Sequence, residues 1–173
     1  MKARTPKESK AITTDLVLPG ETNPINNLFG GDLLARMDRI ASIAARRHSR
    51  SHVVTASVNH VAFQKPIPLG SVMTLEASVS RAFRSSMEII IDVYIEDKHS
   101  GTRVLANDAI YTFVAVNDEG TPVKAPPIQP ETDKEKERYE AALRRRQLSL
   151  VLAGKLDPKE ATELKALFYG KEE

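Results

Sequence analysis

The residues with the clearest chemical potential lie between Thr22 and Asp38, where a polar loop runs into the pair Gly30-Gly31. A helix is predicted to begin there, and the first backbone N–H groups of a helix are unpaired and carry a partial positive charge. Because glycine has no side chain, a carbonyl group could approach those N–H groups closely and be polarised by them. The same glycines would also simply let the helix pack tightly against a curved sheet.

Asp38 is the second candidate, because a positioned carboxylate can act as a general base. The apolar stripe of the expected helix centres near Leu33 and Met37, and at about 100° per residue Asp38 lies at the flank of that stripe. Carboxylates that are half in a core or at an interface are usually paired or used. The alternatives are a surface aspartate beside neighbouring arginines and, for Asn23 in the loop, a plain turn residue.

Several other classes of chemistry lack the residues that they need. The chain has no cysteine, which excludes disulfides, thiolate metal sites and a cysteine nucleophile. The four histidines show no metal-ligand spacing, so we expect no metal. Neither the nucleophile elbow of serine hydrolases nor a phosphate-binding glycine-rich loop is present.

The charge and hydropathy of the chain indicate few macromolecular partners. Its 25 basic and 23 acidic residues nearly cancel, so nothing in the charge indicates a nucleic-acid partner. No apolar run approaches the roughly 20 residues needed to cross a bilayer. The first residues are polar and lack the apolar core of a signal peptide. We therefore expect a soluble, cytoplasmic protein without a membrane partner.

Hydrophobic periodicity predicts the elements that must position these residues. A short apolar strand is expected over residues 12–18, and the helix after Gly30-Gly31 extends to about His48. The period then changes to two, which predicts strands over residues 53–63, 72–81, 87–96 and 103–116. Short turns between them suggest a four-stranded antiparallel meander. Because one helix offers a narrow apolar stripe and the strands a wide face, we expect an α+β domain with a five-stranded sheet wrapped around one long helix.

The chain divides into three parts by composition. Residues 1–11 are predicted to be a flexible N-terminus, residues 12–125 the folded domain, and residues 126–173 a proline-rich linker and a helical C-terminal tail. In the tail, a capping box at Thr132 and Glu135 opens a helix to about residue 147, and a second helix follows Pro158. The apolar stripe of that second helix must dock on its own domain or on a neighbour.

Four segments in order carry a family resemblance: TNPINNLFGGDLLARMD over residues 22–38, VVTASV over 53–58, RSSM over 84–87 and YTFVAV over 111–116. Together they resemble the hotdog-fold acyl-CoA thioesterases, the cytosolic acyl-coenzyme A thioester hydrolase family. The similarity covers roughly residues 12–125. The strand–helix–four-strand order of that fold agrees with the order expected from periodicity.

The resemblance implies hydrolysis of acyl-CoA thioesters to free fatty acid and coenzyme A. Asn23 and Asp38 match the catalytic pair of the family, with Asp38 as general base, and Gly31 matches the backbone N–H of the oxyanion site. Each site of the family takes its asparagine from one subunit and its aspartate from the partner. The resemblance therefore implies a dimer, and beyond it a hexamer built as a trimer of dimers.

The resemblance also implies the residues that contact substrate, and it adds no cofactor because coenzyme A enters as part of the substrate. The matching positions are Phe29, Gly30, Thr55, Phe63, Arg84, Ser85 and Ser86, of which the last three form a turn that contacts coenzyme A. One departure concerns Asn26, which stands where relatives often have glycine. Asparagine tolerates positive φ better than most residues, so we expect the turn to survive.

Two rival functions use related chemistry. A hotdog hydroxyacyl-thioester dehydratase would need a catalytic histidine, and no histidine lies in the loop or in the helix before Asp38. A non-catalytic acyl-CoA-binding regulator usually carries a DNA-binding segment, and no helix-turn-helix pattern precedes residue 12. Turnover of a thioester by the purified protein separates the three functions.

Overall fold

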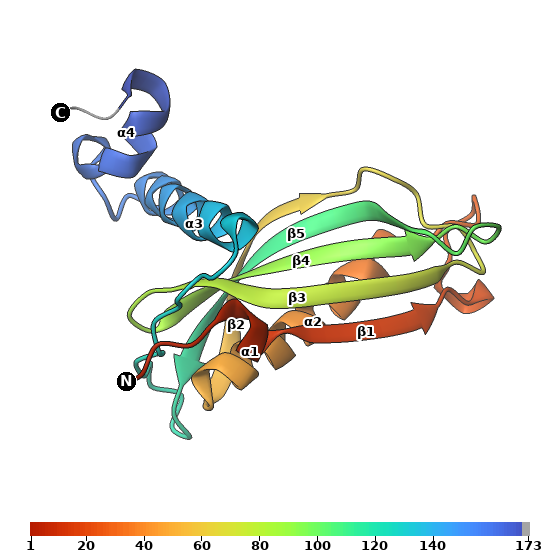
Figure 1. The fold of residues 1–173 in the computed structure, drawn as a ribbon, viewed down its shortest axis with the longest axis horizontal. Coiled ribbons are helices and arrows are strands. Elements are labelled where there is room, and N and C mark those ends of the chain that lie inside the picture. Colours follow the sequence, from red (N-terminus) through yellow and green to blue (C-terminus); the bar gives the residue numbers. More distant parts are fainter. Residues whose placement is uncertain (171–173) are drawn as a thin grey trace. The chain divides into compact units, whose positions relative to one another are not determined.

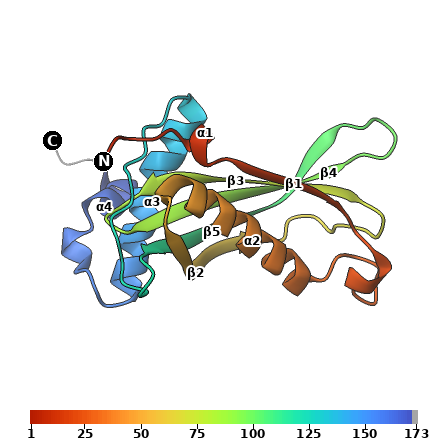
Figure 2. The same ribbon diagram turned by 90° about the horizontal axis from the view of Figure 1, so that it is seen from below.

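The computed structural model describes residues 1–170, and its largest part is a five-stranded antiparallel sheet that curves around one long helix (Figures 1 and 2). The elements are α1 (Pro6–Ser9), β1 (Ala11–Leu16), η1 (Pro19–Glu21), α2 (Gly30–Ser49), β2 (His52–Ala62), β3 (Val72–Ala82), β4 (Ser86–Glu96) and β5 (Arg103–Val116). The predicted α+β class and the helix inside the sheet are confirmed.

The core lies between α2 and the concave face of the sheet. Alternate residues of β4 face the helix and are fully buried, namely Met87, Ile89, Ile91 and Val93. The helix contributes Leu33, Met37, Ile40, Ala41 and Ala44, which recur with the helical period. Burying each of the larger side chains stabilises the fold by roughly 1.5–3 kcal/mol. The helix that carries the candidate residues is therefore held rigidly along its whole length.

The predicted four-stranded meander is wrong in one respect. The sheet order is β1-β3-β4-β5-β2, so β2 pairs with β5 and only β3, β4 and β5 form a meander. Strand β1 occupies the edge of β3 that β2 would have used. The connection over residues 63–71 has a reach of about 30 Å, and three strand spacings require only about 14 Å. The connection is therefore long enough to cross the sheet end.

The N-terminal residues are folded onto the domain, although the sequence predicted a flexible segment. The Ser9 hydroxyl is fully buried, donates to the Pro6 carbonyl at 2.7 Å and accepts the Val79 N–H at 2.9 Å. The Arg4 N–H donates to the Pro127 carbonyl at 3.0 Å. The first compact unit of the chain spans Met1–Gln129, which extends the expected domain of residues 12–125 at both ends.

The second compact unit begins at Pro130 and contains α3 (Asp133–Leu152), η2 (Pro158–Glu160) and α4 (Thr162–Tyr169). The capping box is present, since Glu135 donates its N–H to the Thr132 hydroxyl at 3.2 Å and accepts the Thr132 N–H at 2.9 Å. Helix α3 continues beyond the predicted end at residue 147. Of the helices within residues 1–170, none is both long enough and apolar enough to span a bilayer.

Candidate active site

Asn23 stands in a closed loop that joins η1 to α2. Its backbone N–H donates to the Asn27 carbonyl at 2.8 Å. Its side-chain Oδ1 accepts the N–H groups of Ile25 and Asn27, each at 3.1 Å, which is the geometry of an Asx turn. The side-chain NH₂ of Asn23 has no protein partner within residues 1–170. The loop therefore holds this donor in place and leaves it for a ligand.

Asn26 adopts φ 56°, as the sequence analysis expected for a position where relatives often have glycine. This left-handed conformation is one that asparagine tolerates. The Asn26 carbonyl accepts the Leu69 N–H at 2.9 Å, and its own N–H donates to the Asn23 carbonyl at 3.0 Å. The turn therefore also fastens the loop to the connection between β2 and β3.

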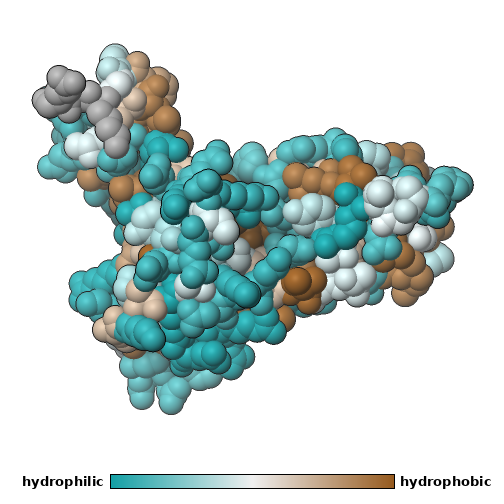
Figure 3. Space-filling model, in the orientation of Figure 1, coloured by the Kyte–Doolittle hydropathy of each residue, from teal (hydrophilic) through white to brown (hydrophobic). Residues whose placement is uncertain are grey.

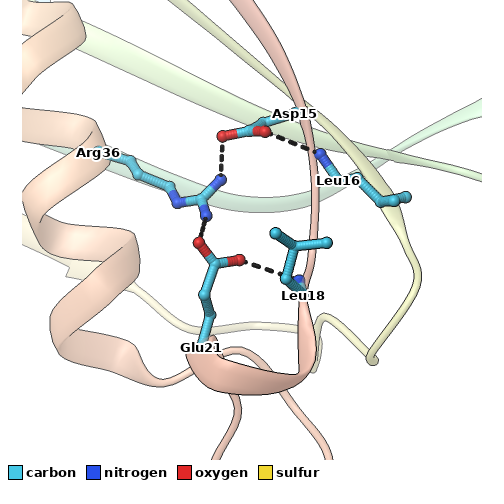
Figure 4. A network of polar contacts seen from close by, with 5 residues as sticks. All are labelled: Asp15, Leu16, Leu18, Glu21 and Arg36. Atoms are coloured by element: carbon cyan, nitrogen blue, oxygen red, sulfur yellow. Dashed lines mark hydrogen bonds and ion pairs between the residues drawn. The ribbon is translucent and has the colours of Figure 1, made fainter.

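A network of ion pairs that was not predicted from the sequence ties the same loop to α2 (Figure 4). Arg36 on α2 binds Asp15 at 2.6 Å through Nη1 and Glu21 at 2.5 Å through Nη2. The second carboxylate oxygen of Glu21 accepts the Leu18 N–H at 2.9 Å. The Glu21 carbonyl accepts the N–H of Phe29, the residue that precedes α2, at 2.8 Å. Both ends of the Asn23 loop thus depend on Glu21.

The glycine pair begins α2, as predicted. Phe29 is the N-cap and makes no side-chain cap bond, so the first N–H groups of the helix remain available to an oxygen atom of a ligand. A Cβ atom on Gly31 would lie 3.1 Å from the Phe29 ring, which is tighter than ordinary contact. A Cβ on Gly30 would lie 3.7 Å from the Phe63 ring. Two aromatic rings therefore flank the helix N-terminus.

Asp38 is half-buried on α2 and accepts the Thr55 hydroxyl of β2 at 2.8 Å through Oδ1. Its Oδ2 has no protein partner in the described part of the chain. Burial raises the pKa of the nearby Tyr111 to about 12, and the negative charge of Asp38 adds to that rise. The Tyr111 hydroxyl donates to the Leu34 carbonyl at 3.3 Å and stays neutral at physiological pH. Asp38 is therefore the group here that can accept a proton from water.

Gly31 and Asp38 of one chain are too far apart to act on the same atom. They are seven residues apart on one helix, which is about 10 Å along its axis. A reacting carbon must lie about 3 Å from both the attacking group and the oxyanion donors. Within one subunit, the Gly31 N–H and the Asp38 carboxylate therefore cannot contact the same reacting atom.

Asn23 opens onto a cavity of about 360 Å³ under the N-terminus of α2. Its lining residues are Asn23, Asn27, Leu28, Gly30, Leu33, Phe63, Lys65, Pro66, Ile67 and Asn107. Asp38 and Thr55 are not among them. The structure thus brings Asn23, Gly30 and Phe63 together, and it places the Asp38–Thr55 pair elsewhere on the same subunit.

The predicted coenzyme A contacts lie at the other end of the sheet. Arg84 and Ser85 occupy the turn between β3 and β4, and Ser86 begins β4. The Asn23 loop contacts the connection that leads into β3 (Figure 1). The eleven residues of β3 separate the two by roughly 36 Å. Within one subunit, the structure does not bring these residues to the Asn23 loop.

A larger cavity of about 750 Å³ lies at the C-terminal end of α2 and contains none of the predicted site residues. It is lined by charges of both signs, including Arg46, Arg50 and Asp118. His52 lies 3.1 Å from the carboxylate of Asp118. This mixture indicates a solvated, charged surface.

Comparison with known proteins assigns a family. The Thioesterase superfamily model matches residues 25–102. An uncharacterized acyl-CoA thioester hydrolase, YkhA, of Bacillus subtilis (strain 168) is 43% identical over 139 residues, covering 80% of this chain and 81% of that protein.

Solved structures agree with that assignment. An apo-hexameric acyl-CoA thioesterase has a TM-score of 0.85 and 36% identity, covering 88% of this chain and 98% of that one. An acyl-CoA hydrolase from Staphylococcus aureus, in complex with butyryl coenzyme A, coenzyme A and coenzyme A disulfide, has a TM-score of 0.82 and 38% identity, covering 95% and 99%. Variants of that hydrolase with one aspartate, threonine or asparagine replaced by alanine are similar as well.

Proposed function

Since this chain belongs to the acyl-CoA thioester hydrolases of the Thioesterase superfamily, we propose that Asp38 activates the water that cleaves the thioester and that Asn23 of a second subunit completes each site. The enzyme is an acyl-CoA thioesterase with the hotdog fold, a sheet wrapped around one helix. We propose which residues perform the reaction and that they come from two subunits.

The observation that carries the assignment of residues is the bond between Asp38 and Thr55. It holds a half-buried carboxylate with one oxygen engaged and the other left to bind water. In the S. aureus hydrolase, the three residues replaced by alanine are an asparagine, an aspartate 15 positions further on and a threonine 17 positions after that. Asn23, Asp38 and Thr55 have the same residue types at the same spacing.

The proposed reaction is direct attack by water. Asp38 takes a proton as the water oxygen bonds to the thioester carbon, and a positioned base of this kind contributes about 10²–10⁴-fold. The N–H of Gly31 at the helix N-terminus stabilises the oxyanion, and one such donor contributes about 10²–10³-fold. The side-chain NH₂ of Asn23 orients the acyl carbonyl or the water. The C–S bond then breaks, and the coenzyme A thiolate leaves and takes up the proton.

The 10 Å between Gly31 and Asp38 is the reason to divide the site between subunits. Strand β2 is an edge of the sheet, and its Val54 and Val58 are each 50% exposed. Exposed apolar edge strands pair with other chains. Two copies that join their β2 edges around a two-fold axis would extend the sheet and place their α2 helices side by side. The loop with Asn23 of one copy then lies near Asp38 of the other.

A hexamer is the proposed assembly beyond this dimer, because one of the similar solved structures is an apo-hexameric acyl-CoA thioesterase. Apolar side chains also remain exposed on strands away from β2, among them Ile12 and Leu16 on β1 and Val104 and Leu105 on β5. Figure 3 shows such apolar areas on an otherwise hydrophilic surface. Patches of this kind mark association surfaces.

Arg84 and its two neighbouring serines are proposed to bind coenzyme A, which enters as part of the substrate without a cofactor or a metal. The exposed guanidinium of Arg84 suits a phosphate group. Because β3 separates this turn from the Asn23 loop by roughly 36 Å, the Arg84 and the Asn23 that serve one substrate come from different subunits.

Thiol release from coenzyme A esters tests the function. The purified protein should hydrolyse saturated acyl-CoA esters, and Asp38→Asn should lose most of that activity while its thermal unfolding midpoint stays close to that of the parent. A protein that binds acyl-CoA without releasing thiol would be a regulator, and one that eliminates water from a 3-hydroxyacyl ester would be a dehydratase.

A further inference from the structure

The floor of the 360 Å³ cavity carries a polar side chain that neither the family comparison nor the proposed mechanism uses. Asn107 belongs to β5, faces α2 and is 1% exposed. Its Oδ1 accepts the backbone N–H of Lys65 at 3.4 Å, a long bond, and that N–H also donates to the Ala106 carbonyl at 3.1 Å. Because the Lys65 N–H can only donate, the Asn107 atom that faces it is the oxygen.

The amide NH₂ of Asn107 consequently points away from its one partner. Within the described residues, this donor makes no hydrogen bond to protein. Buried side-chain donors almost always have a partner, and Asn107 lines a cavity into which one can enter. A second amide donor, Asn23, lines the same cavity and stands where the thioester carbonyl is proposed to bind.

The remaining lining residues of the cavity are both apolar and polar. Leu28, Leu33, Phe63 and Ile67 supply apolar surface, and Asn27 and Lys65 add polar groups. Cavities that combine apolar surface with placed polar groups bind small molecules and orient them through those polar groups. The volume of 360 Å³ is near the lower end of the usual 300–1,000 Å³ range, which suits a short chain.

We propose that Asn107 donates a hydrogen bond to an oxo or hydroxyl oxygen on the acyl chain, so that the preferred substrates are coenzyme A esters of short oxygenated acids. The inference rests on the proposed function, since it takes the Asn23 cavity to hold the acyl group. Asn107 is a specificity residue and takes no part in proton transfer. A saturated chain would leave its donor unpaired and would be turned over more slowly.

The test compares three coenzyme A esters of one length: hexanoyl, 3-hydroxyhexanoyl and 3-oxohexanoyl. Thiol release is followed, and the quantity measured is the ratio of kcat/KM for each oxygenated ester to kcat/KM for the hexanoyl ester. In the parent enzyme the ratio should be about ten for at least one oxygenated ester, as expected for one neutral hydrogen bond. Asn107→Leu should reduce the ratio to about one or below.

Two further variants keep the test decisive. Asn107→Asp retains the acceptor for Lys65 and removes the donor. It should therefore abolish the preference for the 3-oxo ester, whose additional oxygen can only accept, even if the leucine variant does not fold. Thr112→Val is the matched control, because Thr112 lies on the opposite face of β5 and donates to Asn59 at 2.6 Å. The control should keep the parent ratio.

The outcomes separate this inference from the proposed function. If none of the three esters is hydrolysed by the parent enzyme, the proposed function fails. If all three are hydrolysed and the ratio is the same in the parent, Asn107→Leu and Asn107→Asp, the function stands and the inference is overturned, because Asn107 would then be serving only a buried water. A parent ratio of one or below overturns it too.

Discussion

Replacing Glu21 by glutamine should lower kcat about tenfold while the protein stays folded. Glu21 accepts two hydrogen bonds, from Arg36 at 2.5 Å and from the Leu18 N–H at 2.9 Å, and its carbonyl holds Phe29 at the start of α2. Its side chain is 30% exposed and that of Arg36 is 14% exposed. A charge-assisted bond in such a partly buried place contributes about 1.5 kcal/mol. If a loss of that size raises the activation free energy, the rate falls about tenfold.

Asp15 provides a matched control, because it binds the same guanidinium at 2.6 Å but is 63% exposed and belongs to β1. Exposed ion pairs contribute about 0–1 kcal/mol. Asp15→Asn should therefore keep kcat within about twofold. Arg36→Lys should recover part of the activity lost in Arg36→Met, because lysine keeps the charge and reaches only one of the two carboxylates.

The assay is thiol release from a saturated acyl-CoA ester, with kcat and KM determined separately, together with the thermal unfolding midpoint of each variant. The loop acts on chemistry, so kcat should fall in Glu21→Gln with KM almost unchanged. Equal losses of kcat in Glu21→Gln and Asp15→Asn, each matched by an equal loss of stability, would show that the network only supports the fold.

Three further outcomes are expected. Asp38→Asn should lower kcat about 10²–10⁴-fold, and a rate within threefold of the parent would exclude Asp38 as the base. Arg84→Ala should raise KM more than it lowers kcat, since a phosphate contact is equal in ground and transition states; an unchanged KM would remove Arg84 from coenzyme A binding. Burial lowers the pKa of His48 below 6.5, aided by the nearby Arg4, against the bond to the Pro126 carbonyl. The unfolded state then binds the extra proton, so the free energy of unfolding should fall as the pH decreases below about 6.5. Urea titrations at two pH values should show a smaller fall for His48→Gln, and an identical fall would contradict this.

Periodicity predicted the elements but could not predict which strands are neighbours. The helical spacing of Leu33, Met37 and Ile40 and the alternation along β4 identify a buried face locally. The sequence of β2 alone does not indicate that it pairs with β5. Its pairing depends on β1, which takes the free edge of β3. For this reason the prediction of a four-stranded meander was wrong for β2.

The polar composition of the N-terminal residues also led to a prediction that differs from the structure. Residues 1–11 are largely polar, yet the Ser9 hydroxyl is buried because it replaces a backbone partner for Val79 of β3, just beyond the pairing of β3 with β1. A hydroxyl that bridges two segments 70 positions apart leaves no local signal. The bond between Ser9 and Val79 therefore could not be predicted from the sequence, and a flexible segment was predicted instead.

The candidate site likewise contains residues that the local sequence predicts and residues that depend on distant contacts. Asn23, Gly31 and Asp38 were proposed as site residues from a contiguous stretch of 17 residues, and the positive φ of Asn26 was expected where relatives often have glycine. Arg36 and Asn107 were not predicted, because the contacts from which we propose their roles come from distant positions in the chain. Arg36 reads in the sequence as an exposed helix residue. Asn107 stands beside Asp108 in a strand that also contains Arg103 and Thr112, so nothing local distinguishes it.

Subunit complementation tests the shared site most directly. Asn23→Ala and Asp38→Asn are each expected to be nearly inactive, and the two are mixed in equal amounts, unfolded and refolded together. If each site takes Asn23 from one subunit and Asp38 from the other, every mixed dimer holds one intact site, and random pairing restores about a quarter of the parent activity. If both residues act within one subunit, no intact site can form, and activity that stays at the level of the separate variants would contradict the account.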